Sequence, residues 1–487
     1  MAEEVTLGDV DLTTIKARTV SGIVTLVSRS FLLQIVSTGG FLALSIFLGL
    51  PEIGLFIAVN DLISILGYFS DIGLAASLVQ KKAQVSLTDL RTTFTLQQII
   101  VLILIGTMLL FAPVIFSYYR VTGAGTSLYY ALLLAFFLAS LKTIPSVILE
   151  RRLNFQVLAS IEVVENIIFY ALAVFLAWQG WGIRAYVWAV VLRGLVGTAM
   201  IYLLSPWKIG LAISISSLKT LLSFGLPYQL NSLLAVVKDR FLNIILWRII
   251  GAEGVAIIGW AQTWSQKPLR FIMDNVTRVT FPSFSRLQDH PQELKKAIER
   301  TLFFITFVTF PILGGLTILS PLIVQIIPKY SKWEPALLAL ALYCFNSAWA
   351  SVSTPLTNTL NALGKVKINT FLMIMWTVLT WILIPPLASR YGYNGVAIAT
   401  AIIAVSSLVP IAIVKHLTHF SLLNSVLKPF VATLVMMVIS YLLLPVNVTL
   451  NIVLSAITFM FVIYLLVGKS LITDSQKILY ALVGKKA

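Results

Sequence analysis

Residues 92–116 read TTFTLQQIIVLILIGTMLLFAPVIF, a stretch without one charged side chain. A helix needs about 20 apolar residues to cross the hydrocarbon core of a bilayer, so this stretch is long enough to span a membrane. Runs of the same kind recur along the whole chain and are separated by short polar breaks. The sequence therefore predicts an all-α, polytopic membrane protein.

The composition supports this prediction. Of the 487 residues, 59% are hydrophobic and 11% are charged, whereas a soluble domain carries about 25% charged residues. The mean hydropathy is +0.95. The chain opens with Glu3, Glu4, Asp9 and Asp11 where a signal peptide would carry basic residues, so we expect no cleaved signal. Cys344 is the single cysteine, which excludes an intramolecular disulfide.

Counting the apolar runs predicts about fourteen transmembrane helices, arranged as two pseudo-symmetric bundles of six helices and two further C-terminal helices. The expected spans are residues 19–49, 52–79, 92–116, 127–148, 155–178, 184–204, 220–248, 254–284, 301–327, 335–362, 368–388, 393–414, 428–444 and 447–468. We divide the chain into a cytoplasmic N-terminus (1–18), an N-terminal bundle (19–204), a cytoplasmic linker (205–219), a C-terminal bundle (220–414), the last two spans (428–468) and a cytoplasmic tail (469–487).

The distribution of lysine and arginine predicts the topology. Cytoplasmic segments of membrane proteins carry an excess of these residues. Basic residues between the expected spans concentrate in alternate segments, and this alternation holds only if no span has been missed. Both termini are therefore expected to be cytoplasmic. The outer segments hold only Arg120, Arg184, Arg248, Lys329, Lys332 and Arg390.

The two halves of the chain also resemble each other. Residues 180–186 (GWGIRAY) and 393–399 (YNGVAIA) both open a span after a polar turn, and they lie about two hundred residues apart. Many transporters are built from two such repeats. The alternative is that helix starts favour glycine and asparagine in general.

Charged side chains interrupt several expected spans. Each would cost about 3 kcal/mol at the bilayer centre, and together they would exceed the net stability of about 5–15 kcal/mol of a folded domain. They must therefore pair with one another or line a hydrated cavity, although those near a span end have snorkelling to the headgroups as an alternative. The basic ones are Arg29, Lys142, Arg193, Lys238, Arg240, Lys267, Arg270 and Arg278. The acidic ones, considered for ion coupling or charge pairing, are Asp61, Asp71, Glu162, Glu165, Asp239 and Asp274.

One helical face of the expected span 254–284 is cationic. Residues spaced by three, four or seven positions share a face of a helix, and Pro268 within this span predicts a kink or hinge. The face is either a wall that binds an anion or, for its last three residues, a ladder of ion pairs at the cytoplasmic edge. Its members are Trp260, Lys267, Arg270, Asp274 and Arg278.

Three further sets of charges need an explanation. Arg29 lies too deep to reach the near surface easily, so we expect Asp61 or Asp71 to neutralise it, in a structural salt bridge or in a substrate or coupling site. Carboxylates close together in a low dielectric hold a proton readily, which makes Glu162 and Glu165 candidates for proton or cation coupling. Residues 238–240 are consecutive, so a helix would point their side chains in three directions.

No motif for an enzyme, a metal or a nucleic acid is present. The histidines His290, His416 and His419 fall in expected cytoplasmic segments without metal-ligand spacing. No phosphate-binding glycine loop or nucleophile elbow occurs, and the expected outer loops are too short for a catalytic platform. Basic residues are scattered at helix ends rather than gathered in a patch. We therefore expect no catalytic activity, no cofactor, no metal and no nucleic-acid partner.

Several motifs together resemble a known family. Residues 47–56 (FLGLPEIGLF) and 71–81 (DIGLAASLVQK) resemble the start of Wzx-type bacterial polysaccharide flippases, in particular the branch that handles colanic and teichuronic acid. Further similar segments are residues 150–155 (ERRLNF), Asp239 with residues 251–253 (GAE), and 281–288 (FPSFSRLQ), all in the same order over roughly 20–420. Trp260 departs from the pattern, which has tyrosine there.

The resemblance implies the multidrug/oligosaccharidyl-lipid/polysaccharide superfamily, in which two six-helix lobes around a central cavity alternate between inward and outward openings. It also implies that helices 13 and 14 accommodate a polyprenyl tail. The implied substrate is an oligosaccharide linked to undecaprenyl diphosphate, moved to the outer leaflet of the bacterial inner membrane for exopolysaccharide or O-antigen-type synthesis. Protons, sodium ions and a polysaccharide polymerase are further candidate partners.

On this basis the basic residues in the spans become candidates for the diphosphate, since arginine grips phosphate with two parallel hydrogen bonds. Trp260 and Trp264 are candidates for stacking on sugars, with interfacial anchoring as the alternative. Three other functions are the alternatives: a drug or sodium antiporter of the same superfamily, a membrane enzyme of polysaccharide assembly, and a channel. The diphosphate candidates are Arg29, Lys142, Arg193, Lys238, Arg240, Lys267 and Arg270.

Overall fold

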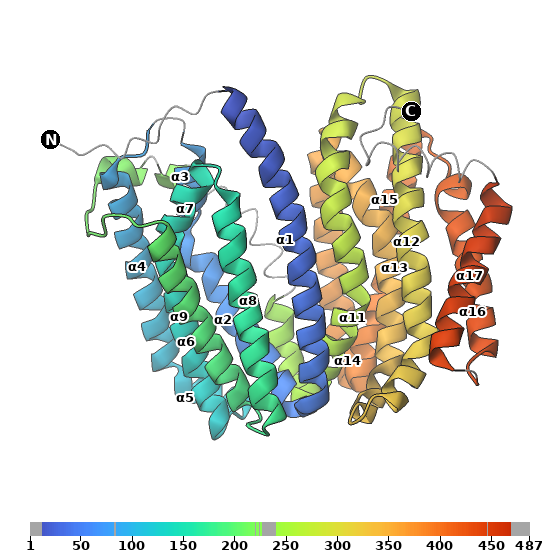
Figure 1. Cartoon of the computed structure of the whole chain (residues 1–487), viewed down its shortest axis with the longest axis horizontal. Helices are drawn as coiled ribbons and strands as arrows, with labels where there is room; N and C mark the ends of the chain where they lie inside the picture. Colours follow the sequence, from blue (N-terminus) through green and yellow to red (C-terminus); the bar gives the residue numbers. More distant parts are fainter. Residues whose placement is uncertain are drawn as a thin grey trace. The chain divides into compact units, whose positions relative to one another are not determined.

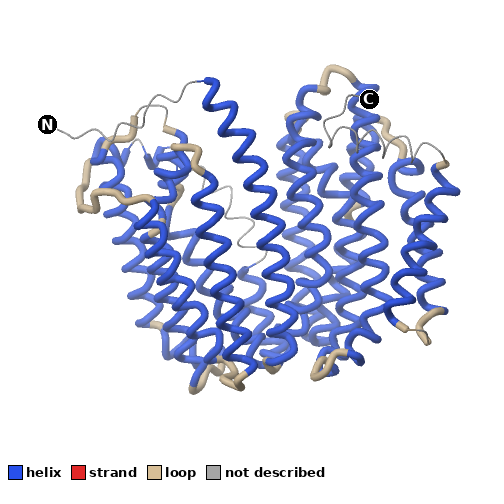
Figure 2. Tube along the Cα trace, in the orientation of Figure 1, coloured by secondary structure: helices blue, strands red, loops and turns tan. Residues whose placement is uncertain are grey.

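A computed structural model describes residues 12–81, 84–219, 221–223, 225, 240–445 and 447–468. Within these ranges the secondary structure is helical and contains no β-strand (Figures 1 and 2). Among the described residues, 12 helices or pairs of helices are long and apolar enough to cross a membrane. The expected all-α polytopic fold is confirmed.

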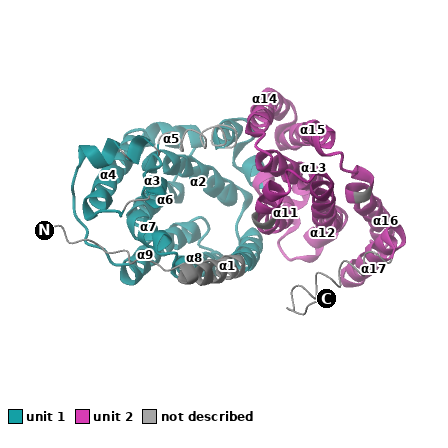
Figure 3. Cartoon of the chain, turned by 90° about the horizontal axis from the view of Figure 1, so that it is seen from above, with its two compact units in different colours: residues 1–256 teal, residues 257–487 magenta. Residues whose placement is uncertain are grey.

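The chain divides into two compact units, one up to Ala256 and one from Ile257 onward (Figure 3). The expected boundary between the bundles lay earlier, at residues 205–219. Contacts of the segment that follows Arg240 explain the later division, because Arg240 pairs with Asp61 and the ring of Trp247 packs 5.2 Å from that of Tyr119. Residues 240–256 therefore pack with the first unit.

The described part of the first unit includes α1 to α9 and the start of α11. In it α1 packs against α8, α8 against α9, and α6 against α9. Its helices are α1 (Leu12–Phe47), α2 (Leu50–Asp71), α3 (Leu74–Gln80), α4 (Leu87–Leu110), α5 (Ala112–Tyr119), α6 (Ala124–Leu141), α7 (Thr143–Arg151), α8 (Phe155–Trp178), α9 (Arg184–Leu204) and the start of α11 (Leu242–Arg286).

The second unit holds the rest of α11 and the C-terminal helices. There α12 packs against α13 and α16, α13 against α14, and α16 against α17. The elements are α12 (Pro291–Ile326), the 3₁₀ helix η2 (Ser331–Ala336), α13 (Leu337–Ala362), α14 (Val366–Val405), α15 (Leu408–Thr418), the π-helical turn η3 (Leu423–Leu427), α16 (Lys428–Leu442) and α17 (Val448–Val467).

One difference between the twelve apolar helical stretches and the fourteen expected spans lies at Gly392 in α14. The other concerns the expected span 220–248, most of which lies outside the described residues. Within α11, Gly251 has φ 68° and ψ −175°, and within α14, Gly392 has φ 61° and ψ −141°. Only glycine adopts these dihedrals readily. Each glycine falls in the gap between two expected spans, 220–248 and 254–284 or 368–388 and 393–414. The count of fourteen stays a prediction.

Pro268 lies inside α11, where the dihedrals remain helical on both sides of it. Inside a helix, proline removes one backbone hydrogen bond and its ring crowds the preceding turn, so the kink or hinge expected at Pro268 stays a prediction. The residue of α11 with non-helical dihedrals is Gly251.

Candidate functional site

Charged residues from α1, α8, α9 and the junction of α6 with α7 meet inside the first unit. Arg29 of α1 pairs with Glu162 of α8. The Lys142 ammonium lies 2.6 Å from Oε1 of Glu165, and Nε of Arg193 lies 3.7 Å from Oε2 of the same carboxylate. We call these five residues the cation–acid cluster.

Helix geometry explains why these side chains meet. Glu162 and Glu165 are three positions apart on α8, so they project from one face. Lys142 is the residue between α6 and α7, and Arg193 lies in the middle of α9. Gly197, one turn after Arg193, lies directly against the carboxylate of Glu165. A glycine at this place lets the carboxylate approach the α9 backbone.

The cluster has more positive than negative charge, since three cations face two carboxylates. The side chain of Glu165 is 7% exposed, whereas those of Arg29 and Arg193 are 28% and 40% exposed. The carboxylate is thus enclosed and its arginine partners retain access to solvent. Within the described part of the chain, Nε of Arg29 is buried and has no hydrogen-bond partner. The cluster therefore has an unused hydrogen-bond donor, Nε of Arg29, and one excess positive charge, both of which favour the binding of an anion.

An aromatic ring adds to the electrostatics of the cluster. The Arg193 guanidinium lies 5.7 Å from the centroid of Phe169, a cation–π distance. Phe169 is buried and is one helical turn from Glu165 on α8. The ring and the carboxylate together orient Arg193, which holds its guanidinium in place beside Lys142.

A second charged group of the first unit joins α2 to the start of α11. Asp61 is buried in α2 and pairs with Arg240, and the amide of Asn243 donates a 2.6 Å hydrogen bond to its other carboxylate oxygen. Both oxygens of this buried acid therefore have partners. Such a pair fixes α11 to α2, because loss of either partner would leave a buried charge uncompensated.

Arg29 does not have the partner that the sequence suggested. The expectation of Asp61 or Asp71 is wrong, because α1 packs against α8 and so brings Arg29 to Glu162. Asp61 is taken by Arg240, and Asp71 accepts a 3.0 Å hydrogen bond from the backbone N–H of Ala75 in the first turn of α3. Asp71 thus provides the acceptor for one backbone N–H in the first turn of α3.

The expected cationic face of α11 lies in the second unit. Nζ of Lys267 lies 5.7 Å from the ring centroid of Trp264, and Arg270 donates a 3.0 Å hydrogen bond to Oε1 of Gln266. Arg270 and Asp274 are exposed, and no ion pair joins them within the part of the chain that the structure describes. Lys238 and Asp239 lie outside the described residues, as does the side chain of Arg278.

The two tryptophans proposed for sugar stacking differ in their surroundings. Trp260 is buried, its ring stacks on that of Trp333 with centroids 5.1 Å apart, and its Nε1–H donates a 2.9 Å hydrogen bond to the hydroxyl of Tyr330. Trp264 is half-buried and carries Lys267 over its ring. In this conformation Trp264 is the more accessible of the two.

Sequence reasoning missed Phe169, Gly197 and Asn243. The spacing contained a signal for Asn243, because a residue three positions after Arg240 shares its helical face. Phe169 likewise follows Glu165 by four positions. Gly197 had no comparable signal, since its role depends on the packing of α9 against α8. In the described residues no group of His, Cys, Asp and Glu has the geometry to hold a metal ion.

Comparison with known proteins gives consistent results. A family model described as "Polysaccharide biosynthesis protein" matches residues 44–338, more than half of the chain. The lipopolysaccharide biosynthesis protein WzxC of Escherichia coli K12 is 26% identical over 242 residues, which are 48% of this chain and 49% of that protein. The chain thus spans about half the length of WzxC in this match. The teichuronic acid biosynthesis protein TuaB of Bacillus subtilis is 24% identical over 76% of this chain and 77% of its own length.

Solved structures with low sequence identity share the fold. The lipid II flippase MurJ, in an inward closed conformation, has a TM-score of 0.74 and 15% identity, with 92% of this chain and 99% of that chain covered. An inward-facing multidrug transporter of the MATE family has a TM-score of 0.58 and 18% identity, over 82% of this chain and 99% of its own. The first is described as a flippase and the second as a transporter, and the likeness to this chain is one of fold.

Proposed function

Since the chain belongs to the polysaccharide biosynthesis protein family, we propose that it is a flippase for oligosaccharides linked to undecaprenyl diphosphate. The resemblance of its sequence to Wzx-type flippases of the multidrug/oligosaccharidyl-lipid/polysaccharide superfamily is confirmed by that match and by the relatives WzxC and TuaB. In the proposed cycle the substrate passes from the cytoplasmic to the outer leaflet of a bacterial inner membrane by alternating access.

The cation–acid cluster is the observation that carries this proposal. A diphosphate presents several negatively charged oxygens, and arginine binds such groups through parallel charge-assisted hydrogen bonds. Arg29, Lys142 and Arg193 converge on two carboxylates among helices long enough to span a membrane. The surplus positive charge and the unpartnered Nε of Arg29 favour an anionic ligand.

In this proposal the two glutamates keep the cluster neutral enough to fold while the substrate is absent. Desolvated cations are costly without a counter-charge. An arriving diphosphate replaces Glu162 as the partner of Arg29, because Glu162 is the more exposed acid at 39% side-chain exposure. Glu165, at 7% exposure, stays with Lys142. The exchange gives the substrate a site without leaving any buried cation unpaired.

Complementation of a bacterial strain that lacks its polysaccharide flippase tests the proposal. The measured quantities are surface polymer and lipid-linked intermediate trapped on the cytoplasmic side. We expect the wild-type gene to restore polymer, and Arg29→Ala, Lys142→Ala and Arg193→Ala to abolish it at normal membrane levels. Lys296→Ala is the matched control, since Lys296 pairs with Glu293 on an exposed face. Full activity of all three cluster variants would refute the proposed site.

The same assay tests the cationic face of α11. Arg270 is exposed and bonded only to Gln266 among the contacts described for it. If this face also binds the diphosphate, Arg270→Ala abolishes export while the protein still inserts in the membrane. Full activity of Arg270→Ala would restrict the diphosphate site to the cluster of the first unit.

A drug antiporter with cation coupling is the second candidate. Its support is the MATE-like fold and the buried carboxylate of Asp61, which would bind a coupling cation after releasing Arg240. Cationic drugs need an anionic cavity, however, and the cation–acid cluster has the opposite excess. A protein that raises resistance to cationic drugs and fails to restore polymer in several flippase-deficient strains would favour this candidate.

A further inference from the structure

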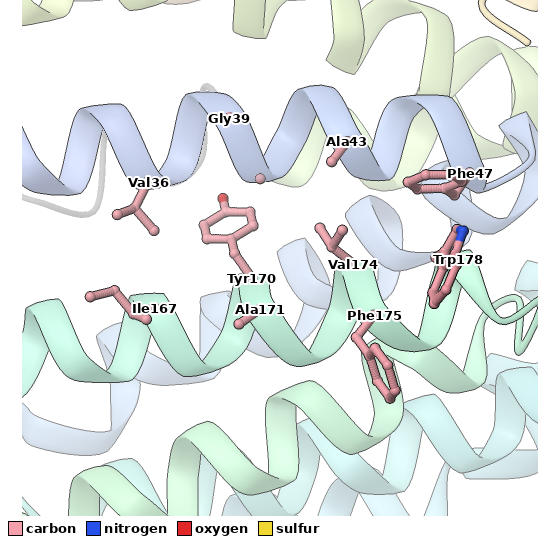
Figure 4. A pocket seen from close by; sticks show the side chains of 11 residues that line it. Val36, Gly39, Ala43, Phe47, Ile167, Tyr170, Ala171, Val174, Phe175 and Trp178 are labelled. Atoms are coloured by element: carbon pink, nitrogen blue, oxygen red, sulfur yellow. The ribbon is translucent and has the colours of Figure 1, made fainter. Parts of the chain in front are cut away.

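An apolar groove runs between α1 and α8 in the first unit (Figure 4). Its volume is about 610 Å³. Small residues, such as Gly39 and Ala43 on α1 and Ala171 on α8, alternate along it with large ones. Tyr170, Phe175 and Trp178 are its aromatic members on α8. The only polar group that Figure 4 shows between the two helices, apart from the Trp178 indole at one end, is the Tyr170 hydroxyl.

The groove follows the two helices lengthwise. From Val36 to Phe47 it follows α1 for eleven residues, which is about 16 Å along a helix axis. Gly40 lies directly against the Tyr170 ring, so the two helices touch there. Beside this contact, Gly39 faces open space, with no atom within 4 Å of the position of an added Cβ. An apolar space that follows the helices over this length suits a hydrocarbon chain lying parallel to them.

The same two helices carry charges beyond one end of the groove. Arg29 precedes Val36 by seven residues on α1, about 10 Å along the axis, and Glu162 precedes Ile167 by five residues on α8, about 8 Å. Their ion pair therefore lies beyond that end of the groove, between the same two helices. An apolar groove that ends at a cation–acid cluster matches an amphipathic ligand with an anionic head and an apolar chain.

We propose that the α1–α8 groove holds the part of the substrate's polyisoprenyl chain next to the diphosphate, while the diphosphate itself lies at the cation–acid cluster. This inference rests on the proposed function. The cluster supplies several donors, which suits a diphosphate better than a single phosphodiester. The assignment differs from the expectation that the last two helices, α16 and α17, take the tail.

Occlusion of the groove tests the inference. Gly39→Leu and Ala171→Leu place an isobutyl group in the groove from opposite walls, and both positions are exposed. Gly106→Leu is the matched control, because Gly106 is an exposed helical glycine of α4 that also has no atom within 4 Å of an added Cβ. The full chain is placed in phosphatidylcholine nanodiscs, and binding of undecaprenyl diphosphate and of inorganic diphosphate is measured.

We expect both groove variants to weaken undecaprenyl diphosphate binding at least tenfold and to leave inorganic diphosphate binding unchanged. Gly106→Leu binds both ligands as the wild type does. Wild-type affinity in both groove variants would refute the groove and leave the flippase proposal intact. Failure of the wild type to bind undecaprenyl diphosphate would instead refute the proposed function. An excess of phosphatidylglycerol that displaces the probe from the wild type but not from Gly39→Leu would assign the groove to membrane lipid and overturn the inference.

Discussion

Glu165 connects two of the three cations of the cluster, since its two oxygens face Lys142 and Arg193. Removing one member of a fully buried ion pair costs about 3–5 kcal/mol. The Lys142 side chain is 22% exposed, so solvent offsets part of this cost. We expect Glu165→Gln or Lys142→Met to lower the free energy of unfolding by about 1–3 kcal/mol. Thermal unfolding in detergent, followed by tryptophan fluorescence, measures the change.

A double-mutant cycle separates this pair from general damage to the fold. Contacting residues show interaction energies of about 0.5–3 kcal/mol in such cycles. Lys142→Met with Glu165→Gln should be no less stable than Glu165→Gln alone, because both variants leave Arg193 without this carboxylate and only Glu165→Gln also leaves the Lys142 charge unpaired. Additive losses would mean that Lys142 and Glu165 do not depend on each other.

Gly197 allows a second prediction for single residues. A methyl group at this position would overlap the Glu165 carboxylate, which packs against the α9 backbone. Gly197→Ala should therefore displace Glu165 from Lys142 and strongly reduce polymer export in the complementation assay. Gly194→Ala, on the same helix, meets the flexible end of Leu138 at 2.9 Å and should keep most of its activity. Equal activity of the two variants would contradict the packing of Glu165 described here.

Among the helices, α11 depends most clearly on one backbone conformation. Gly251 adopts φ 68° and ψ −175°, backbone dihedrals that residues other than glycine rarely adopt. We expect Gly251→Ala to lower the free energy of unfolding by about 1–3 kcal/mol. Gly315→Ala in α12 is the control, since Gly315 is helical and has open space around it. An unchanged melting temperature in Gly251→Ala would show that α11 tolerates a regular backbone there.

The sequence predicted most of the membrane-spanning helices because the apolar period and length of each are local properties. It did not predict breaks such as Ile72 and Gly73, where positive φ values separate α2 from α3. Whether a glycine adopts a positive φ depends on what packs around it. The same limit applies to the site. The sequence identified all five members of the cation–acid cluster as charges that need partners. It could not show which helix packs against which, because tertiary packing decides that. Arg29 was therefore given the wrong partner.

For the molecule as a whole, the stretch Val366–Thr418 determines the topology of the C-terminal half. It has 53 residues, which as one straight helix would be about 80 Å long, more than twice the hydrocarbon thickness. Gly395 lies directly against the backbone of Leu387 and Ala388, residues that would lie about 10–12 Å away along a straight helix. The chain therefore turns back near Gly392, which supports two spans here.

Cysteine labelling measures this turn directly. Cys344 is buried and is the only cysteine, so Cys344→Ala provides a background without reactive thiols. Two spans with a cytoplasmic start predict that Arg390→Cys reacts with a membrane-impermeant maleimide in intact spheroplasts. Lys367→Cys and His416→Cys should react only after permeabilisation, and all three positions are exposed. If residue 390 were protected together with residues 367 and 416, neither half of Val366–Thr418 would cross the membrane. The alternation of basic segments would then fail at this loop, and the expected total of fourteen spans would be wrong.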